Sequence, residues 1–372
     1  MNKKVRIAVI GTGYMAGRHL EFLKDYDLCE VTAVCDVNPD RAKEIAEKYN
    51  CKAYSDHQQL LADKVSDAVL IVTPHFFHTS IGIDALNAGH HVLCEKPLSV
   101  HKADCERLLA AHTNKDLVFG LMFNQRTNPA YRKVKELISS GELGKINRMS
   151  WVITNWFRSD AYYAQGSWRA TWAGEGGGVL LNQCPHQLDM MIWLCGMPER
   201  VRAYCRFGHY HDIEVEDDVT AYMEFPSGAS GVFIANTGEA PGQNTLEICG
   251  DRGRLEIRPT SIHWSRTEHG VEDLTRNDPN PMPEPDTWEI DFTFEDEGRQ
   301  HHEIMENFCE AILNGTELIA PATEGTASVE LCNAMLLSAW SEKMIEIPMD
   351  SAEYEAQLKE KMAGSRFHDK KA

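Results

Sequence analysis

A lysine next to a proline is the first residue in this chain whose type and position could do chemistry. Lys96 lies in Glu95-Lys96-Pro97, at the end of the apolar run that begins at His91. If that run is a parallel strand, Lys96 lies at its carboxyl end, where open α/β sheets bind ligands. A lysine there can contact a hydroxyl group, and partial desolvation lowers its pKa. We therefore predict that Lys96 polarises or deprotonates a substrate hydroxyl; the alternative is a solvated lysine.

A histidine after a glycine run is the second such residue. His186 follows three consecutive glycines at 176–178 and Pro185, which suggests a helix start. The glycines would let a flat ring approach the backbone. The positive helix end disfavours an imidazolium, so His186 should be neutral and able to accept a proton, with Asp189 placed to orient the ring. The alternative is a capping histidine with a solvated aspartate.

Aromatic and polar side chains near the glycine run could hold a substrate. Two motifs precede it, Trp151-x-x-x-x-Trp156-x-Arg158 and Trp168-Arg169-x-x-Trp172. Indole faces stack on the C–H face of a sugar, and arginine forks bind vicinal hydroxyls or a carboxylate. In the alternative, these tryptophans are core or interface residues. The residues predicted to bind substrate are Lys96, Asn124, Trp156, Arg158, Trp168, Arg169, Asn182, Gln183 and His186.

The amino-terminal region carries a phosphate-binding pattern. Val5–Ile10 is an apolar strand that leads into Gly11-x-Gly13-x-x-Ala16 and then a helix, and Asp36 closes the next apolar run. This order is typical of a dinucleotide-binding unit, in which helix N–H groups face two phosphates. Asp36 can accept both ribose hydroxyls and would repel a 2′-phosphate, so NAD is favoured over NADP. The alternative is a glycine turn in a domain that has lost its ligand.

The elements that must position these residues change character along the chain. Residues 1–125 alternate strands and helices, with strands at 5–10, 31–35, 68–72, 91–95 and 117–122 among the six that we expect. This alternation predicts an α/β Rossmann domain with a parallel, doubly wound sheet.

Residues 126–372 have a different pattern. Period-2 runs recur at 201–205, 219–225, 230–235, 245–249, 254–257 and 288–294, with helices at 186–195, 303–313 and 324–344. The pattern predicts an α+β domain with a large, open, mostly antiparallel sheet. An open sheet face of this size usually buries itself against another subunit, so we expect a homodimer or homotetramer through this sheet.

Composition excludes several partner classes. The net charge is −19 and no Lys/Arg block is present, which argues against nucleic acid. No apolar stretch reaches the length of a membrane span. The chain has 11 cysteines, and none forms a C-x-x-C motif, which suits a reducing cytoplasm.

An acidic and histidine-rich stretch follows residue 208. His209 and His211 form an H-x-H pair, which supplies at most two metal ligands, so we predict a polar surface loop and no metal site. Residues 216–218, three acidic residues in a row, are interpreted as a solvated turn.

Together these motifs resemble the Gfo/Idh/MocA family, named after glucose–fructose oxidoreductase, inositol dehydrogenase and a rhizopine catabolism protein. The resemblance implies a Rossmann domain followed by an open-sheet domain that forms the substrate pocket and the subunit interface. It also matches Lys96 and His186 with the catalytic lysine and histidine of the family. The motifs that carry the resemblance are Gly11-x-Gly13-x-x-Ala16, Thr73-Pro74 with His78, Glu95-Lys96-Pro97, and Gly176-Gly177-Gly178 with His186 and Asp189.

With the resemblance included, the predicted cofactor is NAD. The residues expected to contact it are Gly11, Thr12, Gly13, Tyr14, Met15, Ala16, Asp36, Thr73, Pro74, His78, Glu95 and Lys96.

One position departs from the family pattern. Four residues before the histidine the family often has aspartate, whereas this chain has Asn182, which can hold a hydroxyl but cannot relay a proton. The leading hypothesis is NAD-dependent oxidation of a secondary hydroxyl of a sugar, glycoside, anhydrosugar or cyclitol by hydride transfer. The alternatives are a redox-assisted glycosidase, in which NAD is regenerated after bond cleavage, and a non-catalytic nucleotide-binding sensor.

Overall fold

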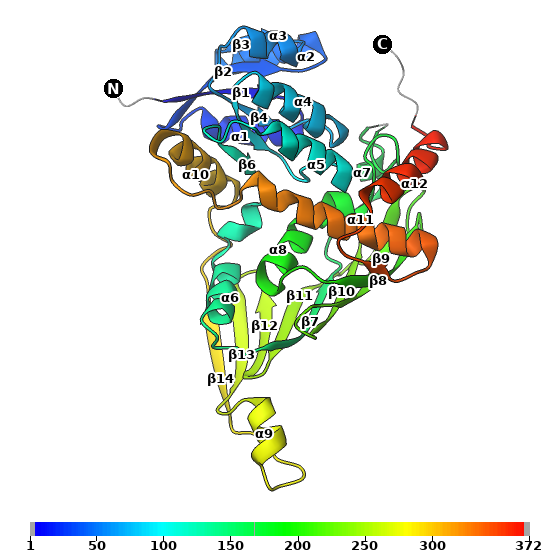
Figure 1. Ribbon diagram of the computed structural model, residues 1–372. Helices are drawn as coiled ribbons and strands as arrows, with labels where there is room; N and C mark the ends of the chain where they lie inside the picture. Colours follow the sequence, from blue (N-terminus) through cyan, green and yellow to red (C-terminus); the bar gives the residue numbers. More distant parts are fainter. Residues whose placement is uncertain (1–3, 167, 368–372) are drawn as a thin grey trace. The chain divides into compact units, whose positions relative to one another are not determined.

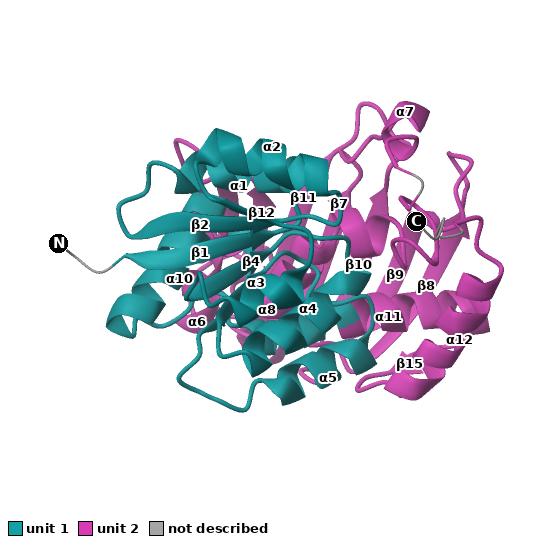
Figure 2. Ribbon diagram, turned by 90° about the horizontal axis from the view of Figure 1, so that it is seen from above, with its two compact units in different colours: residues 1–124, 299–329 teal, residues 125–298, 330–372 magenta. Residues whose placement is uncertain are grey.

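The structure is a computed structural model that describes residues 4–166 and 168–367. The chain divides into two compact units (Figure 2), and each contains two stretches of sequence. The first unit comprises Met1–Asn124 and Arg299–Val329, and the second comprises Gln125–Gly298 and Glu330–Ala372.

The first unit is built on a six-stranded parallel sheet, which confirms the predicted Rossmann-type fold. The strand order is β3-β2-β1-β4-β5-β6. The chain first adds strands on one side of β1 and then, from β4 onwards, on the other side, so the strand order reverses between the adjacent strands β1 and β4. Ligands of such sheets bind outside the carboxyl ends of the strands at this reversal. The strands are β1 (Val5–Ile10), β2 (Cys29–Cys35), β3 (Lys52–Tyr54), β4 (Ala68–Ile71), β5 (His91–Cys94) and β6 (Phe119–Leu121).

Helices cover both faces of this sheet, as Figure 2 shows for α1 and α2 on one side and α4 and α5 on the other. The start of α2 follows from its sequence, because Asn38 accepts hydrogen bonds from the N–H groups of Asp40 and Arg41, and Pro39 takes the first helical position. The helices are α1 (Tyr14–Leu23), α2 (Pro39–Tyr49), α3 (His57–Ala62), α4 (Phe76–Asn87) and α5 (Lys102–Ala111).

Residues 299–329 belong to the first unit, whereas the predicted boundary at residue 125 assigned them to the second domain. This segment contains α10 (His301–Asn314) and the short helix η3 (Ala322–Glu324). Ile304, Met305 and Phe308 on the apolar face of α10 join the hydrophobic core of the first unit. That core is therefore completed by residues that are far from it in the sequence.

The second unit contains a nine-stranded sheet that is open and mostly antiparallel, as predicted. Its order is β14-β13-β12-β11-β7-β10-β9-β8-β15, and β7 and β10 form its parallel pair. Neither β7 nor β13 was predicted from the sequence. The strands are β7 (Ile146–Ile153), β8 (Arg200–Phe207), β9 (Glu216–Glu224), β10 (Ser230–Asn236), β11 (Asn244–Gly250), β12 (Gly253–Arg258), β13 (Ser261–Thr267), β14 (Thr287–Thr293) and β15 (Ile345–Glu346).

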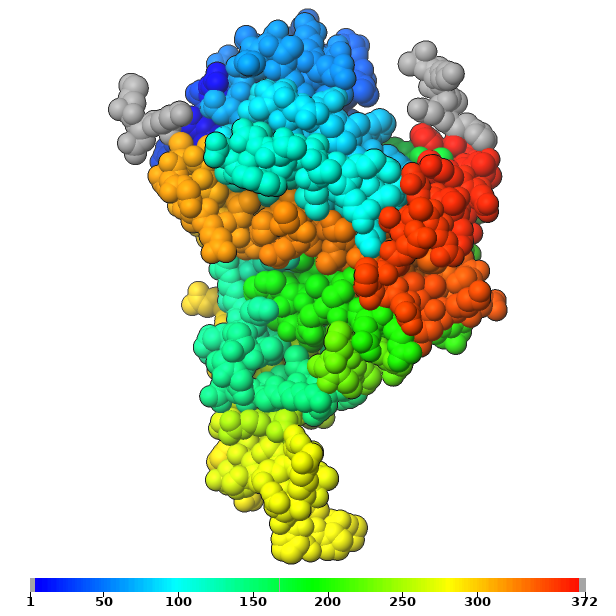
Figure 3. Space-filling view, in the orientation of Figure 1, coloured from blue at the N-terminus to red at the C-terminus, as the bar shows by residue number. Residues whose placement is uncertain are grey.

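One face of this sheet carries the core of the second unit. Met149, Trp151, Phe233 and Ile248 alternate inward and are fully buried, and α6 and α8 lie against this face in Figure 1. Helix α9 and the proline-rich loop after it, residues 278–286, project from one end of the sheet (Figure 3) and are mostly exposed. The helices of this part are η1 (Asn124–Thr127), α6 (Pro129–Ser139), α7 (Asp160–Tyr163), η2 (Val179–Gln183), α8 (Pro185–Cys195), α9 (Val271–Asn277), α11 (Gly325–Ser341) and α12 (Ser351–Ala363).

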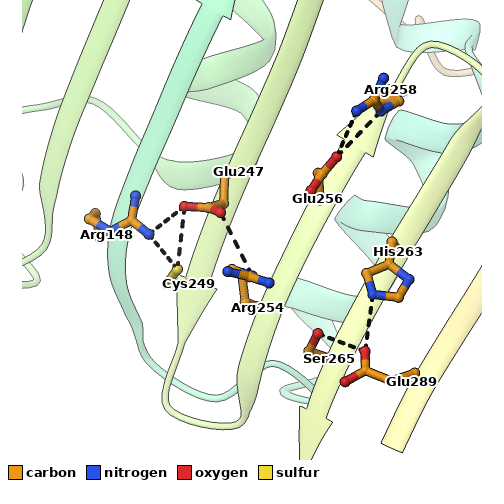
Figure 4. A network of polar contacts seen from close by, with 9 residues as sticks. All are labelled: Arg148, Glu247, Cys249, Arg254, Glu256, Arg258, His263, Ser265 and Glu289. Carbon is orange, nitrogen blue, oxygen red and sulfur yellow. Dashed lines mark hydrogen bonds and ion pairs between the residues drawn. The ribbon is translucent and has the colours of Figure 1, made fainter.

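The opposite face of the sheet is divided into a charged and an apolar part. Towards β14, charged side chains on neighbouring strands pair across the ladder (Figure 4); one such pair joins His263 Nε2 to Glu289 Oε2 over 3.0 Å. Towards β8, Tyr204 and Tyr222 are exposed, with side chains 64% and 42% accessible, and Ile234 is half-buried. This face therefore leaves large apolar side chains in contact with water.

Two further features concern the whole described chain. None of its helices combines the length and the apolar character that crossing a bilayer requires. The 11 cysteines all lie in the described ranges, and none forms a disulfide. Several of these thiols are buried in the two cores, where cysteine acts as a small apolar residue.

Candidate functional site

The glycine turn after β1 has one glycine that the fold requires and one that it does not. Gly11 has φ of +90°, and a Cβ there would lie 2.6 Å from the carbonyl oxygen of Val72, so no larger residue fits. A Cβ on Gly13 would meet no described atom within 4 Å. The space in front of Gly13 is open, and the N–H groups that begin α1 at Tyr14 lie beside it. This arrangement fits a pyrophosphate group.

Asp36 is held as a carboxylate at the end of β2. Its Oδ2 accepts hydrogen bonds from Thr12 N at 2.9 Å and Thr12 Oγ1 at 2.6 Å, and its Oδ1 accepts one from Asn38 N at 3.0 Å. Burial acts to raise the pKa of Asp36, but these bonds outweigh it and lower the pKa. Val37 follows with 92% of its side chain exposed, an apolar surface that the sequence analysis did not single out. An anion beside an exposed apolar residue fits a ribose and its adenine ring.

His78 braces two loops of the first unit. Its Nδ1 lies 2.8 Å from the carbonyl oxygen of Pro97, and its Nε2 lies 2.9 Å from that of Thr73. The ring is fully buried, and burial lowers its pKa. The structure therefore gives His78 a position behind the loops that contain Thr73-Pro74 and Lys96-Pro97. Its side chain holds those loops and exposes no atom to solvent.

Glu95 forms a buried pair with a histidine on α1. His19 Nε2 lies 2.7 Å from Glu95 Oε1, and both side chains are almost completely buried. Burial acts to raise the pKa of Glu95, but the hydrogen bond and charge of His19 outweigh it and hold the pKa at about 2. The other carboxylate oxygen accepts the backbone N–H of Lys96 at 3.1 Å. This pair therefore ties the helix that begins at the glycine turn to the peptide of Lys96.

Asn124, predicted to bind substrate, lies at the carboxyl side of β6 in the first unit. It is buried, and its Nδ2 donates a hydrogen bond to Gln300 Oε1 at 2.6 Å. Gln300 directly precedes α10, so the segment that returns to this unit also fixes the orientation of Asn124.

In the second unit, the glycine run is built around a buried glutamate. A Cβ on Gly178 would lie 2.0 Å from the carbonyl oxygen of Glu216, so the glycine is required by the approach of β9. Glu216 is fully buried and accepts the N–H of Gly178 at 2.9 Å and of Leu180 at 3.0 Å. Burial raises the pKa of Glu216 to about 7.

The interpretation of residues 216–218 as a solvated turn was therefore wrong. Asp217 is also buried, and it accepts the backbone N–H groups of His209 and Tyr210 at 2.8 and 2.7 Å. The two carboxylates supply acceptors for backbone donors that would otherwise lack them, which is why an acidic run points inward.

Asn182 is held by a second buried glutamate, Glu175. Asn182 Nδ2 donates to Glu175 Oε1, and Ala170 N donates to Glu175 Oε2 at 2.6 Å. The side chain of Arg169 lies 3.8 Å from the same carboxylate. Glu175 thus orients two residues that the sequence predicts as substrate ligands.

His186 lies in the first turn of α8, which begins at Pro185 as predicted. Asp189, one turn further on, accepts two hydrogen bonds from Arg126, over 2.9 Å from Nε and 2.6 Å from Nη2. Both side chains of this ion pair are buried. Removing one partner of such a pair is strongly destabilising, so Arg126 fixes the helix that carries His186.

Aromatic and arginine side chains gather around α7 in what we call the Tyr162 cluster, defined as Trp156, Arg158, Tyr162, Trp168 and Arg169. The guanidinium carbons of Arg158 and Arg169 lie 4.9 and 4.5 Å from the centre of the Tyr162 ring. Arg169 Nη1 donates to Tyr162 Oη at 2.7 Å, and Gln183 Nε2 lies 3.4 Å from the same oxygen. The cluster therefore joins four of the predicted substrate ligands in one place within the second unit, and Gln183, a fifth, contacts it.

The other two tryptophans of the predicted motifs are core residues. Trp151 is fully buried in β7 and donates from Nε1 to Asn244 Oδ1 at 2.9 Å. Trp172 packs edge-on against Trp340, with ring centres 5.5 Å apart.

The His209-His211 stretch serves the fold. His211 Nδ1 lies 3.1 Å from Asp217 Oδ2, and its Nε2 lies 2.8 Å from the carbonyl oxygen of Arg158. Within residues 4–166 and 168–367, no group of three or more His, Cys, Asp or Glu side chains is placed to hold a metal ion.

Sequence reasoning missed several supporting residues. His19 had a usable signal, because Ala16, His19, Leu20 and Leu23 form the buried face of α1 at helical spacing, and a buried histidine needs a partner. Glu175, Tyr162 and Glu216 had no comparable signal, since their partners come from the folding of separate segments.

Comparison with known proteins identifies the same two parts. Residues 5–123 match the family described as an oxidoreductase family with an NAD-binding Rossmann fold, and residues 131–256 match the GFO/IDH/MocA C-terminal domain. A myo-inositol 2-dehydrogenase of Thermotoga maritima is 30% identical over 69% of this chain and 77% of its own length. A levoglucosan dehydrogenase of Pseudarthrobacter phenanthrenivorans is 24% identical over 94% of this chain and 100% of its own.

Solved structures with the same fold include the WlbA dehydrogenase of Chromobacterium violaceum in complex with NADH and UDP-GlcNAcA. It has a TM-score of 0.81 and 26% identity, and the match covers 94% of this chain and 98% of that one.

The half-buried His301, near Glu95, predicts acid sensitivity. Burial lowers the pKa of His301 from 6.5 to about 4. Between these values the unfolded chain binds a proton that the folded chain does not, so stability falls as the pH drops from about 6.5 to about 4. We expect the free energy of unfolding to lose about 1–2 kcal/mol more between pH 7 and pH 5 in the wild type than in His301→Gln.

Urea denaturation at both pH values measures this difference. The exposed His269→Gln serves as the control and should keep the wild-type pH dependence. Equal losses in the wild type and His301→Gln would contradict the assignment.

Proposed function

The chain belongs to the Gfo/Idh/MocA family of NAD-binding oxidoreductases, and on that premise we propose that it oxidises a secondary hydroxyl group of a sugar, glycoside, anhydrosugar or cyclitol by hydride transfer to NAD. The names of its relatives support this class, since they include dehydrogenases of myo-inositol and levoglucosan. The observation that carries the proposal is the Glu95 carboxylate, which joins His19 on α1 to the backbone of Lys96. It links the helix of the glycine turn to a lysine at a strand end.

We assign proton transfer to Lys96 and His186. The ammonium group of Lys96 donates a hydrogen bond to the reacting oxygen and favours its deprotonation. His186, in the first turn of α8, accepts the proton as a neutral imidazole. NAD, when bound, supplies the hydride acceptor. Because Asn182 cannot carry a proton, it holds a neighbouring hydroxyl together with Gln183.

Lys96→Met and His186→Gln should each lower kcat/KM about 10²- to 10⁴-fold, since each removes a group that acts on the proton in the transition state. A screen of monosaccharides, anhydrosugars, glycosides and inositols, followed by NADH absorbance, first finds the best substrate. Lys115→Met and His269→Gln, at exposed positions, are the matched controls.

Wild-type kcat/KM in both variants would refute the assignment. Glycoside cleavage without net accumulation of NADH would instead favour the redox-assisted glycosidase. Binding of NADH with no turnover of any substrate would favour a sensor.

We propose NAD as the natural cofactor because of the charge on Asp36. An ionised carboxylate accepts ribose hydroxyls, and it repels the extra phosphate of NADP. The bonds from Thr12 and Asn38 keep this carboxylate ionised and fixed in place.

Replacing Asp36 by serine should raise the KM for NAD about 10- to 100-fold and reduce the preference for NAD over NADP, because a charge-assisted hydrogen bond is lost and a repulsion is removed. Steady-state kinetics with both cofactors measures the change, and Asp25→Ser at an exposed site is the control. An unchanged ratio of kcat/KM for the two cofactors would argue against this role.

We propose that the open face of the nine-stranded sheet forms a homodimer or homotetramer interface. Tyr204 and Tyr222 expose large apolar surfaces there, and the neighbouring rows of arginine and glutamate offer both signs of charge to a second copy. A two-fold interface needs such a self-complementary patch.

Tyr222→Glu should weaken this assembly about tenfold or more, because it would place a charge in a desolvated contact. Light scattering coupled to size exclusion gives the mass of each species. Val271→Glu on α9, also at an exposed apolar residue, is the control and should keep the wild-type mass. A monomeric wild type would refute the proposal.

Two wider assignments follow. We assign dinucleotide binding to the first unit, and substrate binding and assembly to the second. We also propose the cytoplasm as the site of action, because the 11 thiols without a disulfide suit a reducing compartment.

A further inference from the structure

The Tyr162 cluster contains more hydrogen-bond donors than the protein uses. Each guanidinium group has five N–H donors. Among the described residues, the guanidinium group of Arg158 donates one hydrogen bond, to the carbonyl oxygen of Phe157, and that of Arg169 donates one, to Tyr162 Oη. Arg158 Nε, Arg169 Nε and Trp156 Nε1 are buried and have no acceptor in the described part of the chain. Buried donors without acceptors are costly, so the cluster lacks an acceptor-rich group.

The hydroxyl group of Tyr162 also lacks a hydrogen-bond acceptor among the described residues. Its hydroxyl oxygen receives the donors of Arg169 and Gln183. Its own hydroxyl hydrogen remains available for an acceptor. The donors therefore converge beside Gln183, in the segment that leads to His186.

The positive charge of the cluster is only partly compensated. Arg158 forms no ion pair within the described residues, and Arg169 lies 3.8 Å from Glu175, a longer distance than in a close pair. The nearby Asp212 pairs with Arg366, and Glu214 accepts the N–H of Trp172. Asp160, in the first turn of α7, is exposed to solvent.

Two guanidinium groups against one buried carboxylate leave a net charge of one, which matches a single carboxylate.

From these observations we propose that the substrate carries a carboxylate, as a sugar acid does, and that Arg158 and Arg169 bind it beside Tyr162. The inference rests on the proposed dehydrogenase function and narrows its substrate class. A phosphate monoester would carry up to two charges near neutral pH, more than the cluster balances. The planar guanidinium group also matches the two oxygens of a carboxylate.

Matched pairs of ligands test the charge alone. D-Glucuronate and D-galacturonate are compared with their uronamides, which keep the shape and lose the charge. We expect kcat/KM to be at least about tenfold higher for the better uronate than for its uronamide, the discrimination that a charge-assisted contact gives. Binding is measured separately, through the tryptophan fluorescence of the NADH-bound protein.

Charge-removing variants locate the contact. Arg158→Gln and Arg169→Gln should each raise the KM for the uronate about 10- to 100-fold, a clearly larger increase than for the uronamide, and should change kcat less than KM. Arg158→Lys and Arg169→Lys keep the charge and should recover part of the loss. Arg276→Gln, on the exposed helix α9, removes one charge far from the cluster within this unit and should change nothing. Thermal melting confirms that each variant is folded.

The outcomes separate the inference from the function on which it rests. Turnover of neutral sugars with no preference for a uronate, or uronate kinetics unaffected in both glutamine variants, overturns the carboxylate proposal and leaves the dehydrogenase standing. Uronate binding that depends on both arginines, without any NADH formation, supports the site and refutes the dehydrogenase.

Equal binding of uronate and uronamide overturns the inference even if neither turns over. If the glutamine variants do not fold, the lysine variants are compared with the wild type. A preference for uronate over uronamide that the lysine variants retain supports the carboxylate proposal. A wild type that lacks this preference overturns the proposal.

Discussion

An ionised carboxylate shut away from water must be matched by donors on every side, and Glu95 is the clearest case in this protein. One of its oxygens faces His19, and the other accepts the N–H of Lys96. His301 lies next to the pair, with its ring centre 5.5 Å from that of His19. Helix α1 and the segment that follows β5 are thus joined at one buried charge, and α10 contributes a ring contact beside it.

In the second unit, buried glutamates also accept hydrogen bonds, mainly from backbone N–H groups. Glu216 accepts the N–H groups of Gly178 and Leu180, and Glu175 accepts that of Ala170 and the amide of Asn182. A glycine-rich segment has little side-chain packing to order it, so these acceptors supply the order. The residues proposed to hold substrate are therefore positioned by carboxylates that do not themselves need to touch it.

The sequence predicted the parts of this structure that are local. The glycine turn and the start of α8 at Pro185 each depend on neighbouring residues, and the two sheet types follow from strand spacing. β3 was not located because two of its three residues are exposed, and β7 was overlooked because Trp151 was interpreted as part of a ligand motif. The polar pairs could not be predicted, since His19 and Glu95 are 76 positions apart and Gly178 and Glu216 are 38 apart. Only the folded chain brings such partners together.

Because residues 299–329 belong to the first unit, the core of that unit is complete only after most of the second unit has been synthesised. Phe308 and its neighbours on α10 belong to a core whose strands leave the ribosome almost two hundred residues earlier. Until that helix emerges, the amino-terminal sheet exposes an apolar surface in the growing chain. Strands β7 to β14 of the second sheet are therefore translated while the core of the first unit is still incomplete. During this period a chaperone has a defined apolar surface to protect.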